Sequence, residues 1–146
     1  MRVLAVLAAF LLGGLPAQAA TISLTLTGTD YEGGPAFFAE AGQYPVGAGV
    51  LAVFDRPQIY SFTIPDAALE AAGFIQVRFL NDRYSRGVGD RNLRVLAVSV
   101  NGTAYVGAQL STLDQAGESV APGNLSTSGR LVRILRPAGG WPSRGP

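Results

Sequence analysis

The sequence contains no cysteine, no histidine and no lysine. Without cysteine there is no disulfide framework, so the hydrophobic core or a bound ion has to hold the fold. Without histidine the chain lacks the usual acid–base catalyst and the commonest zinc ligand, and without lysine no Schiff base can form. These absences exclude serine–histidine and cysteine proteases and zinc hydrolases, and they leave paired carboxylates as the one route to hydrolysis.

Long apolar runs are also scarce, and the single one opens the chain. Residues 3–15 (VLAVLAAFLLGGL) follow Arg2 and are too short for a helix that spans a bilayer. Residues 17–19 (AQA) have the small-x-small pattern that signal peptidase accepts. We therefore predict a signal peptide over residues 1–19, a secreted or periplasmic protein and no membrane span; the alternative, an N-terminal membrane anchor, needs a longer run.

Excess charge of either sign is missing as well. Without Arg2, the remaining chain has ten arginines and ten acidic residues. A neutral protein has no general electrostatic attraction for nucleic acid or for an anionic membrane. We therefore expect no nucleic-acid partner.

What is present is a series of short segments with period-two alternation, separated by Gly, Pro and Asn. The expected strands cover residues 21–27, 35–40, 44–54, 59–64, 74–80, 93–100, 103–106 and 130–135. One short helix is expected over residues 66–72, with Asp66 as its N-cap. The pattern predicts one all-β domain over residues 20–137, an antiparallel β-sandwich or jelly roll.

The C-terminal segment is expected to be a flexible tail. Residues 138–146 (AGGWPSRGP) are rich in Gly and Pro, a composition that does not favour packing. Trp141, the one tryptophan of the chain, lies in this segment. Tryptophan is a common platform for sugars, but a platform in a flexible tail would not be rigid.

Two acids lie in a polar loop between the two clearest expected strands. Asp82 follows the strand over residues 74–80, and Asp90 precedes the strand over residues 93–100. If these two strands are neighbours, the loop folds back and both carboxylates converge at one edge of the sandwich.

Asn81 and Asn92 add neutral oxygen donors beside these acids. Two carboxylates, amide oxygens and loop carbonyls form the set of ligands that calcium prefers, six to eight hard oxygens in a flexible geometry. The spacing is not that of an EF-hand. The competing interpretation is that Asp and Asn at strand ends form Asx turns with their own backbone, and spacing alone favours it.

A resemblance changes that balance. Residues 79–102 (FLNDRYSRGVGDRNLRVLAVSVNG) resemble the signature of the calcium-dependent xylan-binding carbohydrate-binding modules. Members show Asn-Asp at the end of one strand, a short loop, and Asp-Arg-Asn-Leu opening a strand that ends in Asn-Gly. Residues 81–82, 90–93 and 101–102 match these three parts in order.

The resemblance implies a jelly roll in which a loop-bound calcium ion contacts sugar hydroxyls directly. It makes Asp82 and Asp90 the charged ligands, with loop carbonyls completing the shell. Asn81 and Asn92 are further candidate ligands, and Asn92 is alternatively a brace for the loop. Tyr84 lies within the loop, where its ring either stacks on a sugar or packs over the loop as a lid.

The leading hypothesis is thus a secreted, calcium-dependent and non-catalytic module that binds a xylan-like polysaccharide. The alternative is a calcium-stabilised envelope or matrix protein whose ion contacts no sugar. A third hypothesis, a glycosidase, pairs Asp82 with Asp90 or with Glu40. The pattern specifies neither the glycan nor the oligomeric state.

Overall fold

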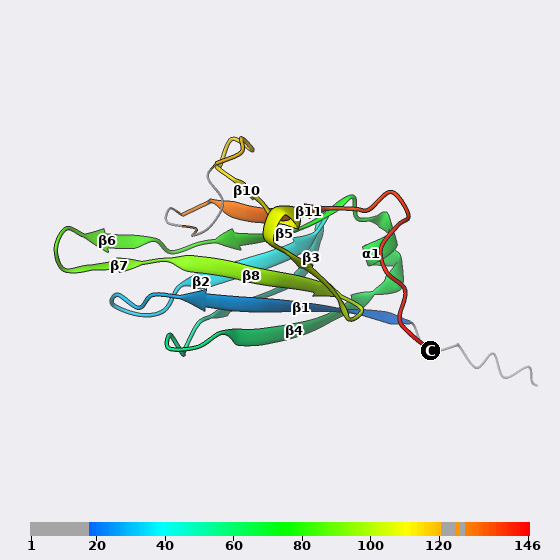
Figure 1. Cartoon of the computed structure of the whole chain (residues 1–146), viewed down its shortest axis with the longest axis horizontal. Helices are drawn as coiled ribbons and strands as arrows, with labels where there is room; N and C mark the ends of the chain where they lie inside the picture. Colours follow the sequence, from blue (N-terminus) through cyan, green and yellow to red (C-terminus); the bar gives the residue numbers. More distant parts are fainter. Residues whose placement is uncertain (1–17, 121–124, 126–127) are drawn as a thin grey trace, which may run out of the picture.

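The structure, a computed structural model, describes residues 18–120, 125 and 128–146. Most of the predicted signal peptide, residues 1–17, lies outside the described residues. Two antiparallel sheets lie face to face, with a two-stranded hairpin extending from one end (Figure 1). The predicted all-β sandwich is confirmed. In the part of the chain that the structure describes, no helix is long and apolar enough to cross a membrane.

The first sheet has four strands in the order β4-β1-β8-β9. Its strands are β1 (Ala19–Gly28), β4 (Gln58–Pro65), β8 (Leu93–Val100) and β9 (Thr103–Val106). The second sheet has five strands in the order β10-β11-β5-β2-β3. Its strands are β2 (Ala36–Ala41), β3 (Tyr44–Val50), β5 (Phe74–Phe79), β10 (Ser111–Leu113) and β11 (Leu131–Leu135).

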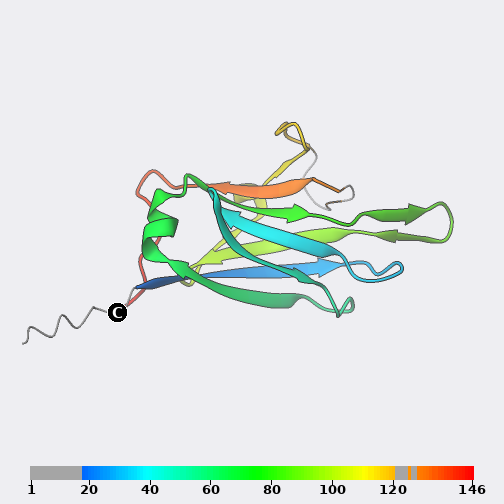
Figure 2. The same ribbon diagram turned by 180° about the vertical axis from the view of Figure 1, so that it is seen from behind.

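Three shorter elements complete the fold. The hairpin consists of β6 (Arg83–Ser85) and β7 (Gly89–Arg91). Helix α1 (Asp66–Ala71) covers the opposite end of the sandwich, and the 3-10 helix η1 (Gly107–Gln109) follows β9 (Figure 2). The predicted cap is wrong by one position: Pro65 is the N-cap and Asp66 is the first helical residue. An acid in the first turn is still favourable, because the helix dipole is positive there.

The core lies between the two sheets, and alternation along the strands produces it. In β1, Ile22, Leu24 and Leu26 are fully buried, while the residues between them face outward. Phe37 of β2 and Val77 of β5 meet them from the second sheet and are also fully buried. Each such side chain contributes about 2 kcal/mol when it is removed from water. This single core explains how the chain folds without disulfides.

Strand β10 lies outside the expected strands. It pairs with β11 at the edge of the second sheet, where Thr112 lies opposite Val132. The sequence around β10 is polar and too short to show alternation, so its pairing with β11 rather than its own pattern makes it a strand.

The C-terminal segment packs on the domain, so the predicted flexible tail is wrong. The Trp141 indole Nε1 donates a hydrogen bond of 2.8 Å to the carbonyl of Ala72 at the end of α1. Its ring meets Tyr105 edge to face, with 6.3 Å between centroids. A carbonyl at a helix end needs a donor, and Trp141 supplies one together with a large apolar ring. These contacts hold the segment in place despite its many Gly and Pro residues.

The two ends of the described chain meet at the end of the sandwich that α1 covers. The Arg144 guanidinium lies 2.9 Å from Gln18 Oε1 and 3.0 Å from Asp66 Oδ2. Figures 1 and 2 place the C-terminus beside the start of β1, with the β6–β7 hairpin at the opposite end.

Candidate functional site

The β6–β7 hairpin carries the two acids of the predicted site. Strands β5 and β8 belong to different sheets, so they are not the neighbours on which the expected convergence of the acids depended. Residues 83–85 instead pair with residues 89–91, with Tyr84 opposite Asp90. The turn is closed by a hydrogen bond of 3.0 Å from Val88 N to Ser85 O. The loop therefore forms a hairpin of its own, and this hairpin carries Asp90 with Asp82 directly before its first strand.

The register places four of the predicted residues on one face of this hairpin, which we call the front face. Tyr84 and Asp90 form a cross-strand pair, as do Arg83 and Arg91. Side chains alternate between faces, and the same register continued by one step sets Asp82 opposite Asn92. Asp82, Tyr84, Asp90 and Asn92 therefore share the front face, whereas Arg83 and Arg91 point to the back.

Two oxygen atoms of the front face are buried without a hydrogen-bond partner among the described residues. They are Asp82 Oδ1 and Asn92 Oδ1. The Asn92 amide is oriented by its Nδ2, which donates a 2.8 Å hydrogen bond to Asp90 Oδ2. Leaving a buried acceptor unsatisfied costs about 1–3 kcal/mol, and more for a charged group. Two such acceptors on one face are the arrangement that a hard cation would satisfy.

The donor set fits calcium better than zinc. Among the described residues no group of three or more His, Cys, Asp and Glu side chains gathers closely enough to hold a metal ion with such side chains alone. The front face instead offers two carboxylates and one amide oxygen. Calcium accepts such mixed oxygen ligands and completes its shell with backbone carbonyls or ligand hydroxyls. Asp82, Asp90 and Asn92 are therefore the side chains that would hold it.

Asn81, the fourth predicted metal ligand, is used differently. Its Oδ1 accepts a 2.6 Å hydrogen bond from Ala36 N, and its Nδ2 donates to Gly34 O at 3.2 Å. The Asn81 side chain thus ties the end of β5 to the start of β2. Both of its polar groups have backbone partners, so the Asn81 side chain braces the base of the hairpin, and its ligation of a metal stays a prediction.

Arg91 is the main functional residue that the sequence analysis missed. It is only 7% exposed, although a charged side chain is seldom buried. Its guanidinium donates to the carbonyls of Gly33 at 2.8 Å, Asn81 at 2.9 Å and Tyr31 at 2.7 Å, and also to that of Glu32. Arg91 belongs to the Asp-Arg-Asn-Leu string, but nothing local indicates that its partners come from residues 31–33.

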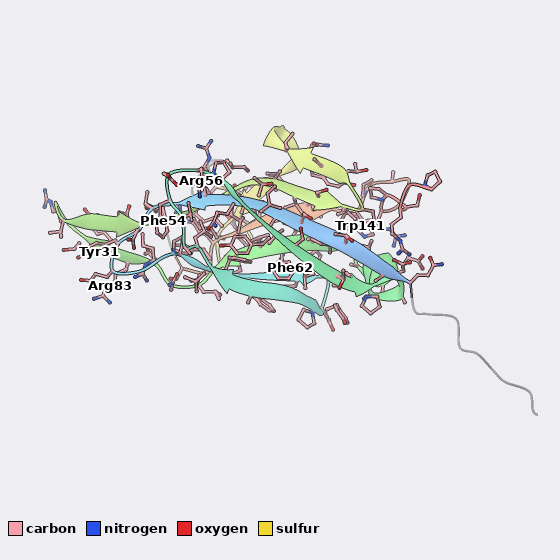
Figure 3. All side chains as sticks on the ribbon, turned by 90° about the horizontal axis from the view of Figure 1, so that it is seen from below. Tyr31, Phe54, Arg56, Phe62, Arg83 and Trp141 are labelled. Carbon is pink, nitrogen blue, oxygen red and sulfur yellow. The ribbon has the colours of Figure 1, made fainter. Side chains whose placement is uncertain are left out.

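Residues 29–33 support the hairpin from behind. Thr29 Oγ1 donates to the Asp90 carbonyl at 2.7 Å and accepts from Asn92 N at 2.9 Å. The Tyr31 ring lies against Gly89, where an added Cβ would come within 2.2 Å of the ring. Figure 3 shows Tyr31 and Arg83 together at this end of the molecule.

Two further contacts fix the ends of the hairpin. Glu32 forms an ion pair with Arg83. On the other side, Asp82 N donates a 2.7 Å hydrogen bond to Ser128 Oγ, a partner that no sequence pattern indicated. The front face is thus held by contacts from residues 29–36 and from Ser128, which keeps its oxygens in place before any ligand arrives.

Tyr84 is the exposed group of the front face. Its side chain is 65% exposed, and it lies directly across the hairpin from Asp90. A ring that packed over the loop as a lid would be largely buried. Its exposure favours the other interpretation of the sequence, in which the ring is free to contact a ligand beside the acids.

Glu40 does not belong to this site. Its carboxylate accepts a 2.7 Å hydrogen bond from Gln76 Nε2 and lies 3.7 Å from Arg78 Nη2, on the outer face of the second sheet. The glycosidase hypothesis that pairs Asp82 with Glu40 therefore has no support in the geometry.

Comparisons with known proteins agree with this architecture. Residues 21–114 match the family model CBM60, described as a Ca-dependent, xylan-binding carbohydrate-binding module. A structure of the selenomethionine form of vCBM60, from work linking two families of calcium-dependent carbohydrate-binding modules by circular permutation, is 21% identical with a TM-score of 0.56. The match covers 77% of this chain and 88% of that one.

A second solved structure, vCBM60 in complex with galactobiose, is 20% identical with a TM-score of 0.52. It covers 78% of this chain and 94% of that one. No curated protein matches. At these identities the two solved structures show the shared β-sandwich fold, and the family model confirms the resemblance found in residues 79–102. The chain belongs to CBM60, a family of carbohydrate-binding modules.

Proposed function

We propose that this protein is a secreted module that binds xylan-like polysaccharides through a calcium ion held on the front face of the β6–β7 hairpin. The observation that carries the proposal is the pair of buried acceptors without partners, Asp82 Oδ1 and Asn92 Oδ1. They lie at the positions where the family resemblance places ligands. When bound, the calcium ion would supply a positive charge and open coordination positions for sugar hydroxyls.

Each residue of the site would have a different role in binding. Asp82 and Asp90 provide the negative charge, while Asn92 both orients Asp90 through its Nδ2 and directs its own Oδ1 into the site. Arg91 fixes the carbonyls behind the hairpin, so little conformational freedom is lost on binding. Tyr84 offers the face of an exposed ring to the sugar.

The alternative function, a structural ion without sugar contact, is less well supported by this geometry. A structural site is expected to be closed by protein ligands. Here the hairpin extends beyond both sheets, and Tyr84 and Val88 are 65% and 73% exposed around its tip. A polysaccharide chain can reach such a site without rearrangement of the fold.

Affinity electrophoresis in gels that contain soluble xylan tests the proposal. We expect retardation in calcium, none in EDTA, and none for Asp82→Ala in either buffer, because one remaining carboxylate holds calcium far more weakly. Asp55→Ala is the matched control, since Asp55 is an exposed acid outside the site that pairs with the neighbouring Arg56. Retardation of folded Asp82→Ala in calcium would contradict the proposal.

Secretion has a separate test. Expression of the full chain in a bacterial host should yield, in the periplasm or medium, a product whose intact mass corresponds to a start at Ala20. A product that retains residues 1–19 in the membrane fraction would support the anchor instead.

A further inference from the structure

A cavity of about 690 Å³ lies at the end of the sandwich opposite the hairpin. It opens between α1, the turn after β8 and the C-terminal segment. Figure 3 shows Trp141 at this end, far from Tyr31 and Arg83 at the hairpin. The cavity is thus remote from the front face, and its volume lies in the range of small-molecule sites.

Trp141 is held in place where it lines this cavity. Its indole N–H is bonded to the Ala72 carbonyl at 2.8 Å, and Tyr105 meets its ring edge to face. The Asn101 Nδ2 donates to the carbonyl of Pro142 at 2.8 Å, which fixes the backbone beside it. A fixed, half-buried indole provides a rigid apolar surface for the C–H face of a sugar.

The polar groups around Trp141 suit a neutral, hydroxyl-rich ligand. Asp66 and Glu70 line the cavity together with Arg136 and Arg144, so the acids and bases balance. Asp66 is paired with Arg144 at 3.0 Å, and Arg136 bonds the backbone carbonyl of Glu70. Among the described residues the carboxylate of Glu70 has no hydrogen-bond or ion-pair partner, and Glu70 is exposed. A balanced set of acceptors and donors does not select for an ion of either sign.

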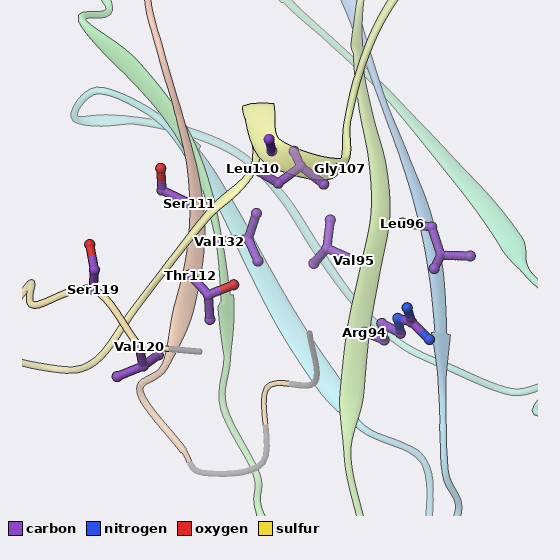
Figure 4. Close-up of a pocket in the computed structure, with 11 residues that line it drawn as sticks. Arg94, Val95, Leu96, Gly107, Leu110, Ser111, Thr112, Ser119, Val120 and Val132 are labelled. Carbon is purple, nitrogen blue, oxygen red and sulfur yellow. The ribbon is translucent and has the colours of Figure 1, made fainter. Parts of the chain in front are cut away.

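A second cavity, of about 580 Å³ between β8 and the β10–β11 pair, lacks this combination. Figure 4 shows aliphatic residues such as Val95, Leu110 and Val132 around it, with Arg94 as the charged residue of its described lining. No aromatic ring is among its described lining residues. The chemistry expected for a sugar is therefore found at the α1 end.

We propose that the cavity at the α1 end is a second carbohydrate-binding site, independent of calcium, with Trp141 as its platform and Glu70 as an acceptor for sugar hydroxyls. Trp141 lies outside residues 21–114, the part that matches the family model. Gln18 also lines the cavity and falls within the predicted signal peptide, so the proposal uses none of its atoms. The site takes its ligand class from its own lining and does not depend on the front face.

The single tryptophan makes the test specific. The mature chain, residues 20–146, is titrated with xylotetraose and with galactobiose while Trp141 fluorescence is recorded, first in EDTA and then in calcium. We expect a saturable change of emission in EDTA for at least one of the two sugars. If neither sugar causes a saturable change in either buffer, the proposal of a second site is overturned. The proposed function is tested separately by affinity electrophoresis.

Variants separate this site from the front face. Glu70→Gln should weaken the apparent affinity in EDTA about tenfold, while Glu118→Gln, the same change in an exposed loop residue, should not. Asp82→Ala should leave the response in EDTA unchanged. An emission change that needs calcium and disappears in Asp82→Ala, or one that Glu70→Gln leaves unaltered, would also overturn the proposal.

Discussion

Arg91 is a buried residue on the back of the hairpin, and its hydrogen bonds support the front face from behind. Its charge has no acidic partner among the described contacts, and backbone carbonyls of residues 31–33 and 81 surround it instead. Hydrogen bonds from a charged donor are stronger than neutral ones. The planar fork of the guanidinium reaches several carbonyls at once, which an ammonium group cannot do.

Replacement of Arg91 should therefore weaken both the fold and the site. For Arg91→Lys we expect a loss of roughly 3 kcal/mol in the free energy of unfolding, because several carbonyls lose their donor. Urea unfolding measures this loss, and calorimetry should show weaker calcium binding. Arg94→Lys, at an exposed position of β8, should stay within about 0.5 kcal/mol of the wild type. Equal effects of the two changes would contradict the role of Arg91.

Gly89 supports the hairpin through close packing rather than through charge. Gly89→Ala should weaken calcium binding, because the new Cβ would lie 2.2 Å from the Tyr31 ring and force the hairpin away from its support. Gly73→Ala is the matched control, since nothing lies within 4 Å of a Cβ at that position. Calcium titrations of the two variants should differ clearly; if both match the wild type, the contact with Tyr31 is not needed.

At the scale of elements, the β6–β7 hairpin is the part most dependent on outside support. A two-stranded hairpin alone is marginally stable in water, and this one has three-residue strands. The contacts of Arg91 and Thr29 hold its back, while its front presents unsatisfied oxygens. We therefore expect its stability to depend on the ion more than that of any strand in the sheets.

Hydrogen exchange measures that dependence directly. Calcium at about one hundred times its Kd adds roughly 2.7 kcal/mol to the stability of the state that binds it. Amides of residues 83–91 should exchange more slowly in calcium than in EDTA, with a smaller change in β1 at the centre of its sheet. Unchanged exchange across the hairpin would argue against calcium at the front face.

Elements also differ in how well the sequence predicts them. The strands of the core were predicted because alternation, as in Ile22, Leu24 and Leu26, is a local pattern that burial imposes. The hairpin was not predicted, because its three-residue strands are too short to show alternation and they pair only with each other. The site acids were identified by motif, whereas Arg91 and Ser128 depend on partners dozens of residues away.

At the scale of the whole molecule, the C-terminal segment closes the end of the sandwich that α1 covers. Trp141 packs against the core, Asn101 bonds the carbonyl of Pro142, and Arg144 pairs with Asp66. These contacts join both sheets, since Asn101 follows β8 of the first sheet and α1 leads into β5 of the second. Removal of this segment should therefore lower the stability of the whole domain.

Truncation tests this expectation. A chain that ends at Pro137 loses the Trp141 ring and its hydrogen bond, so we expect a loss of about 3 kcal/mol and a melting temperature lower by several degrees. A chain that lacks only residues 145–146, which are exposed, is the control. Identical melting curves by circular dichroism would mean that the segment only rests on the surface.

The meeting of the two chain ends gives the molecule a direction that matters for anything fused to it. Because the C-terminus lies beside the start of β1 at one end of the molecule and the hairpin projects from the other end, a protein fused to either terminus of the mature chain should lie away from the front face and leave it accessible. The same fusion partner would lie beside the cavity at the α1 end, which Trp141 lines. Immobilising the protein on a sensor chip by its C-terminus should therefore preserve binding at the front face and obstruct binding at the cavity of the α1 end.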